Sequence, residues 1–246
     1  VTGVQTCALP IWHICPCCPP MFLKIMAAMP GYIYAYQGDN VYVNLFIGSE
    51  VRVPVGKSNS VRLKQLTSYP WHGAVSIQVN PDKASTFSMK VRIPGWAQGT
   101  ENPYDLYQSN LKAPVKLKVN QEDVLLRIVD GYAEINREWK KGDHIELELP
   151  MQPRLITANK AVENLRGQVA LASGPIIYCF EDADNPELQT FKLQAQTPLE
   201  LSHDSNLLNG VNIIKCQGDI PAKAIPYYAV ANREESHSYK VWIPQK

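Results

Sequence analysis

The sequence predicts an all-β protein in which two antiparallel β-sandwich domains follow one short helix. Short runs of alternating apolar and polar residues recur along most of the chain, and clusters of Gly, Asn, Asp and Pro separate them. Several short strands with turns at such intervals are typical of β-sandwiches. The alternation stops around residues 151–167 and then resumes. This interruption predicts a domain boundary near residue 153.

Length and composition are those of a globular protein. The chain has 246 residues, of which 45% are hydrophobic and 19% charged. Its 24 basic and 23 acidic side chains leave a net charge of +1, so the sequence indicates neither a nucleic-acid-binding surface nor an acidic tail. The longest apolar stretch, residues 169–180, is shorter than the roughly 20 residues that span a membrane. We therefore expect neither a nucleic acid nor a membrane as a partner.

The first eleven residues, "VTGVQTCALPI", have neither strand nor helix periodicity. They resemble the in-frame translation of a short-read sequencing adaptor. On this interpretation Cys7 is not a biological cysteine, and the native sequence begins near Trp12. Residues 1–11 are therefore set aside from the fold prediction, as a tag would be.

Residues 12–36 contain the one predicted helix. Phe22, Ile25, Met26 and Met29 recur at helical spacing and form one apolar stripe. Pro20 suits the first turn of a helix, and the Pro-Gly pair at 30–31 ends it. A helix of about ten residues is marginal alone in water, so its stripe predicts a partner surface.

The strands fall into two series that define two sandwiches, residues 37–153 and 154–246. In the first, strands are expected at 41–48, 75–79, 87–94, 115–119, 132–139 and 145–150. In the second, strand patterns lie within 168–180, 224–233 and 239–244. The turn signals of the first series stand at 38–40, 80–82, 130–131 and 141–143.

Half of the six cysteines lie within nine residues, "HICPCCPPM". Clustering of Cys15, Cys17 and Cys18 indicates a metal site or a reactive thiol, with incidental thiols as the alternative. A Cys17–Cys18 disulfide is disfavoured, because neighbouring Cα atoms lie about 3.8 Å apart and an unstrained bridge needs roughly 4.4–6.8 Å. Cys179 and Cys216 lie in apolar strand patterns and are expected in the core.

Motifs in a fixed order connect the chain to a known family. They read "CCPP", "GYIYAYQGDNVYVNLFIGS", "YPWHG", "VRIPGWA", "GYAEINREWKKGD", "ELPM", "GQVALASGPIIYC" and "IPYYAVANR…YKVWIP". In this order, from about Cys15 to the end, the chain resembles the C-terminal part of glycoside hydrolase family 127. The best-known members of that family are β-L-arabinofuranosidases. No single motif is specific, but their colinear order is.

The resemblance implies a retaining hydrolase that releases terminal β-L-arabinofuranose from plant-type glycans. In the family an (α/α)6 barrel precedes the β-sandwiches, and one Glu and three Cys hold a zinc ion. Cys17 and Cys18 match the adjacent thiols of that zinc site, and Cys17 matches the nucleophile. Cys15 is not expected to bind the metal. Residues 12–36 match the end of the barrel with its last helix.

The family's acid/base Glu and remaining zinc ligands belong to the barrel upstream of these motifs. The sequence therefore reads as a C-terminal fragment, and we expect it to be inactive alone. Two alternatives stay open: a carbohydrate-binding or structural accessory module without catalysis, and a small zinc-binding protein. The tryptophans could form a sugar-stacking surface, although a core role is the more common one for such residues (Trp71, Trp96, Trp139 and Trp242).

Overall fold

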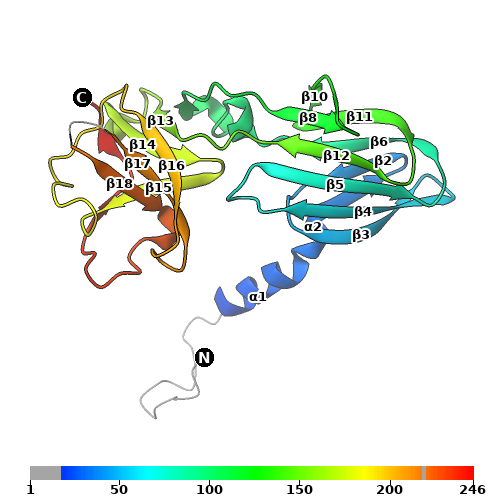
Figure 1. Cartoon of the computed structure of the whole chain (residues 1–246), viewed down its shortest axis with the longest axis horizontal. Helices are drawn as coiled ribbons and strands as arrows, with labels where there is room; N and C mark the ends of the chain where they lie inside the picture. The colour runs from blue at the N-terminus through cyan, green and yellow to red at the C-terminus, as the bar shows by residue number, and fades with distance from the viewer. Residues whose placement is uncertain (1–17, 218–219) are drawn as a thin grey trace, which may run out of the picture.

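The computed structural model describes residues 18–217 and 220–246 and consists mainly of β-sheet (Figure 1). Within these residues there are two α-helices, α1 (Cys18–Ala28) and α2 (Pro30–Ile33), which precede the strands. The predicted all-β class with one short preceding helix is confirmed, and α1 covers most of the predicted helical segment. α2 is a single further turn that follows it directly.

The first domain contains two sheets that enclose one core. The five-stranded sheet has the order β1 (Tyr34–Gln37), β2 (Asn40–Val43), β6 (Ser85–Arg92), β11 (Tyr132–Trp139) and β10 (Ile128–Val129). The six-stranded sheet has the order β3 (Ser49–Val55), β4 (Asn59–Thr67), β5 (Ala74–Pro81), β12 (Asp143–Glu148), β8 (Lys116–Val119) and β9 (Glu122–Asp123). Alternate residues of both sheets point inward, as in β4, where Val61 and Leu63 are fully buried and Arg62 is exposed.

One predicted strand is wrong in its second half. Alternation across residues 41–48 predicts one strand, but β2 ends at Val43 and Ile47 is exposed. The chain leaves the five-stranded sheet here and enters the six-stranded sheet as β3. The crossing buries Phe46 in the core between the sheets. Phe46 is out of phase with Val41 and Val43, so the apolar residues at 45 and 47 extend the strand pattern in the sequence beyond the point where the strand ends.

The charged turn after Trp139 also differs from its prediction. The turn signal at 141–143 lies between the strands expected at 132–139 and 145–150, and the charged segment from 137 to 143 would suit a hairpin between them. Instead, β11 belongs to the five-stranded sheet and β12 to the six-stranded one. Gly142, with φ of 93°, lets the chain turn from one sheet to the other. By contrast, Asp130 and Gly131 both have positive φ and close a two-residue hairpin between β10 and β11.

The second domain is built on one nine-stranded sheet. Its main path runs β16 (Leu199–Asp204), β17 (Val211–Cys216), β18 (Ala222–Pro226), β15 (Ile176–Glu181), β14 (Gln168–Ser173), β13 (Arg154–Ala158) and β7 (Tyr107–Ser109). β19 (Tyr239–Lys240) pairs with β15, and β20 (Ile243–Pro244) pairs with β14. β14 and β15 pair near their shared turn, so the segment with β19 and β20 continues the pairing at their other ends.

Both faces of this sheet are buried. Leu171 and Phe180 pack in the cluster on one face, whereas Ala170 and Cys179 pack in clusters on the other. Strands covered on both sides read as continuous apolar runs rather than as alternation. This explains why the second series, such as "QVALAS", alternates less clearly than the first.

β7 connects the two halves of the chain. Residues 107–109 lie within the segment that the sequence assigns to the first sandwich, yet β7 pairs with β13 of the nine-stranded sheet. Two 3-10 helices, η1 (Gly95–Gln98) and η2 (Pro103–Asp105), lead to it from β6. A segment from the middle of the first domain therefore forms the edge of the second.

Candidate functional site

The cysteine pair that the sequence singles out lies at the margin of the described residues. Cys17 lies outside them, as do Cys7 and Cys15, so the geometry of the pair stays a prediction. Cys18 is the first residue of α1 and is exposed. Pro19 and Pro20 occupy the first turn of the helix, where a backbone N–H has no intrahelical acceptor to lose. The two prolines thus begin the helix that carries Cys18.

α1 has no buried residue. The apolar stripe predicted for this helix is solvent-exposed, with 64% of Phe22, 52% of Ile25 and 55% of Met26 accessible. Helices of globular proteins normally bury such a stripe. The helix and the first domain meet mainly through α2, where Ile33 is buried.

Metal binding can be judged on the donors present. Among residues 18–217 and 220–246, no three His, Cys, Asp or Glu side chains come together as a metal site would require. Thiolate sulfur is a preferred zinc ligand, and structural zinc sites almost always have four ligands. Cys17 and Cys18 therefore fit zinc by donor type and would supply half of such a set.

The other described cysteines are not part of a reactive site. Cys179 is fully buried and Cys216 is 1% exposed, which confirms them as core thiols. Burial raises the pKa of each thiol to about 12, and at Cys179 the charge of Glu181 adds to the effect. Both therefore stay protonated at neutral pH, and the thiolate is the reactive form of cysteine.

The four tryptophans divide between core and surface. Trp139 and Trp96 are buried, and Trp242 packs partly buried beside the Ile156 cluster. Trp71 is 47% exposed. The core interpretation therefore holds for three of them and fails for Trp71. Its loop, "YPWHG", lies where the two domains face each other, since the Trp71 indole Nε1 donates to the Tyr228 hydroxyl at 3.2 Å.

A buried ion pair anchors the β7 segment to the second domain. The Arg154 guanidinium donates to both carboxylate oxygens of Glu101, from Nε at 2.7 Å and from Nη2 at 2.8 Å. Its Nη1 donates to the Gly174 carbonyl at 2.7 Å, and its guanidinium lies 5.3 Å from the centre of the Trp96 ring. Burial opposes ionisation of Glu101, but the hydrogen bonds and charge of Arg154 outweigh it and lower its pKa.

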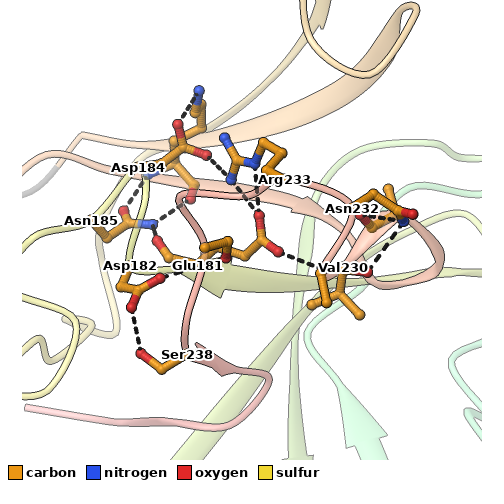
Figure 2. A network of polar contacts seen from close by, with 12 residues as sticks. Glu181, Asp182, Asp184, Asn185, Val230, Asn232, Arg233 and Ser238 are labelled. Carbon is orange, nitrogen blue, oxygen red and sulfur yellow. Dashed lines mark hydrogen bonds and ion pairs between the residues drawn. The ribbon is translucent and has the colours of Figure 1, made fainter.

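A second buried network, made of ion pairs and hydrogen bonds, lies at the C-terminal end of β15 (Figure 2). Arg233 pairs with Glu181 and, at 2.6 Å, with Asp184, which also accepts from Lys223 at 2.5 Å. The backbone N–H of Ala231 donates to the second Glu181 oxygen at 2.7 Å. Every charge in this network has a partner of opposite sign, so we assign it a structural role.

Neither network can be recognised in the sequence. Glu101 and Arg154 are separated by 53 residues, and Glu181 and Arg233 by 52. Pairing at such distances depends on the topology. The nearest signal was the motif "IPYYAVANR", in which Ala231 has φ of 58° and Asn232 donates to the carbonyls of Ala229 and Val230. These bonds shape the turn that aims Arg233 at Glu181.

Across the described part of the chain, no helix is both long and apolar enough to cross a membrane.

Comparison with known proteins identifies both domains. The family model for the middle domain of GH127, β-L-arabinofuranosidase, matches residues 40–151. The model for the C-terminal domain of glycoside hydrolase family 127 matches residues 153–244. A curated relative, the non-reducing end β-L-arabinofuranosidase of Bifidobacterium longum subsp. longum, is 28% identical over 91% of this chain and 36% of its own length.

Two solved structures are also similar. A GH127 β-arabinofuranosidase is 34% identical with a TM-score of 0.85, over 96% of this chain and 39% of its own. A GH127 β-L-arabinofuranosidase from Geobacillus stearothermophilus T6 is 34% identical with a TM-score of 0.82, over 96% of this chain and 38% of its own. The chain thus spans less than two fifths of the length of these relatives. With both family domains matched in order along most of its length, the chain belongs to glycoside hydrolase family 127.

Proposed function

We propose that this chain forms the last part of the active site and both C-terminal β-domains of a retaining glycoside hydrolase. The proposed substrate is a terminal β-L-arabinofuranosyl residue of a plant-type glycan. Membership of family 127 carries the proposal, and relatives described as β-L-arabinofuranosidases support the choice of sugar. The catalytic centre would be shared with residues that this chain does not supply.

Cys17 is the proposed nucleophile. Retaining glycosidases usually attack the anomeric carbon with a carboxylate, and a thiol can replace it once it is ionised. A zinc ion held by Cys17 and Cys18 would supply that ionisation, because a thiol that coordinates zinc is deprotonated. The Cys17 sulfur would form a bond to the anomeric carbon as the bond from that carbon to the leaving oxygen breaks, and that oxygen would take a proton from an acid outside this chain. Water would then attack the same carbon, the carbon–sulfur bond would break, and the Cys17 thiolate would be regenerated.

Cys18 and the two prolines have positioning roles in this proposal. Cys18 is exposed at the start of α1. A residue that precedes proline is restricted in its backbone conformation, so Pro19 limits Cys18 and Pro20 limits Pro19. The helix that they begin would hold both thiols at a fixed angle to the substrate.

The test uses the longer enzyme of which this chain would form the C-terminal part. Its gene is obtained by recovering the coding sequence upstream of Trp12, and the purified enzyme is then assayed. It should hydrolyse an aryl β-L-arabinofuranoside, and Cys17→Ser should abolish turnover. Cys15→Ser, in the same segment, is the matched control and should leave turnover intact. Turnover that survives Cys17→Ser would disprove the nucleophile.

The 246-residue chain alone should show no turnover above background. General acid catalysis typically contributes about 10²–10⁴ in rate, and the proposal places that acid outside the chain. Turnover by the purified chain that Cys17→Ser removes would show that the chain carries a complete catalytic centre. The proposed sharing of the site would then be wrong.

A further inference from the structure

A cleft of about 360 Å³ lies between the two domains. The first domain contributes the loop from Trp71 to Gly73 and the end of β12 at Glu148, and the second contributes β16 and β17 through His203 and Asn212. This volume is within the range of about 300–1,000 Å³ that is usual for ligand pockets, which often lie at domain interfaces.

Trp71 is held firmly although it is half-exposed. Its backbone N–H donates to the Ser68 carbonyl at 3.0 Å, and its indole Nε1 donates to the Tyr228 hydroxyl at 3.2 Å. Its carbonyl accepts from the Asn212 side chain at 3.2 Å. Both main chain and ring are therefore fixed before any ligand arrives. A preordered aromatic ring loses little conformational entropy when a ligand packs on it.

Polar groups surround this ring. Asn212 donates from Nδ2 to the Trp71 backbone carbonyl, and its Oδ1 lies 3.0 Å from Nδ1 of His203, so one amide holds both the Trp71 main chain and the His203 ring. His72, Glu148 and Ser202 complete the polar lining, and no Lys or Arg is among the described residues around the cleft. The combination offers donors and acceptors for hydroxyl groups but no cation for an anionic ligand.

The cleft continues onto the outer face of the six-stranded sheet. A second hollow of about 380 Å³ shares Ala74 and Glu148 with it. Lys116 and Lys118 of β8 lie directly opposite Glu148 and Glu146 of β12, so the charges along this hollow balance. Together the two hollows form a groove of low net charge with both apolar and polar lining.

From these observations we infer that the interdomain groove binds a neutral glycan chain, with one sugar packed on Trp71. A sugar ring has an apolar C–H face, which suits the exposed indole, and a rim of hydroxyls, which suits Asn212, His203 and Glu148. The second hollow, which shares Ala74 with the cleft, gives room for further sugars. This inference concerns binding alone and does not depend on the proposed hydrolysis.

Affinity gel electrophoresis of the 246-residue chain tests the inference, with soluble arabinan, arabinoxylan or dextran in the gel. At least one of these neutral polysaccharides should retard the chain, and Trp71→Ala should weaken its apparent affinity by about tenfold or more, as for an aromatic hot spot. Tyr36→Ala is the matched control, because Tyr36 is 59% exposed in β1 and lines neither hollow. It should leave the retardation unchanged.

A second variant covers the case in which Trp71→Ala disturbs the domain interface. Ala74 is exposed and common to both hollows, so Ala74→Arg should block the groove while leaving the hydrogen bonds of Trp71 in place. It should also abolish retardation, with an unchanged thermal unfolding temperature. Retardation by none of the three polysaccharides, or equal retardation of the wild-type and Ala74→Arg chains, would overturn the inference. So would self-association that Trp71→Ala removes, because the groove would then dock protein.

Discussion

Gly73 lets the Trp71 loop approach the end of the first domain. Its carbonyl accepts a hydrogen bond from the Leu149 N–H at 3.0 Å. A Cβ at Gly73 would lie 2.0 Å from the Leu149 carbonyl oxygen, which is backbone and cannot move aside as a side chain would. The glycine is therefore required by close approach of two chain segments.

Gly73→Ala should lower the free energy of unfolding by about 1–3 kcal/mol, as overpacking usually does. Gly48→Ala is the matched control, since a Cβ there meets nothing within 4 Å. Urea unfolding of both variants measures the difference. Equal stability of the two would mean that the loop relaxes away from Leu149 freely.

The Arg154–Glu101 pair should matter far more than pairs on the surface. Both side chains are almost fully buried. Glu101→Gln leaves the Arg154 charge buried without its counter-ion, which typically lowers the free energy of unfolding by about 3–5 kcal/mol. Asp82→Asn breaks the Arg52–Asp82 pair, whose side chains are 61% and 48% exposed. This variant should change the free energy of unfolding by only about 0–1 kcal/mol.

Guanidinium chloride would mask such charge effects, so urea unfolding at low salt is the appropriate measurement. A similarly small loss of unfolding free energy in Glu101→Gln and Asp82→Asn would show that β7 is held to the second domain by its strand pairing alone.

At the scale of elements, local pattern predicts a strand well only where one face is buried. β5, β6 and β11 are predicted nearly in full, because apolar and polar residues alternate along most of each strand. β3 and β4 also alternate, so the same signal is present in both, although they are not among the strands expected above. β13 could not be found in this way, since Leu155 and Ile156 are both buried under opposite faces of its sheet.

The segment before β19 is fixed to the end of β15 by one carboxylate. Asp182 accepts from the His237 N–H at 3.0 Å and the Ser238 hydroxyl at 2.9 Å. These bonds, led by that from His237, lower the pKa of Asp182 to about 2. Because the folded-state pKa lies below the unfolded value of about 3.9, the charge stabilises the fold above pH 4. That contribution is lost as the pH falls through 2.

Asp182→Asn should therefore flatten the fall in unfolding free energy between pH 4 and pH 2. Urea titrations at several pH values measure the slope, with Asp123→Asn, a change to an exposed carboxylate in β9, as the matched control. An unchanged slope in Asp182→Asn would mean that other carboxylates account for the acid sensitivity.

For the whole molecule, the sequence predicted the class and order of domains but not how they join. The joint depends on β7, the Arg154–Glu101 pair and the Trp71 loop, each of which connects segments that are far apart in the chain. The hydrophobic periodicity of a strand indicates that one of its faces is buried, but it does not indicate which element covers that face. The proposed catalytic cysteines show the same limit: motif order singled out Cys17 and Cys18, but their remaining partners are not fixed by local pattern.

The helix and the two β-domains should differ sharply in hydrogen exchange. α1 has eleven residues and buries none of them, and an isolated helix of this length is marginal in water. Its amides should therefore exchange fast, whereas those of β5, β6 and β14, which line the cores, should exchange slowly. Sedimentation must first establish that the sample is monomeric, because association through Phe22, Ile25 and Met26 would protect the helix. Strong protection of residues 18–28 in a monomer would show that α1 packs on the β-domains and that its apolar stripe already has a partner.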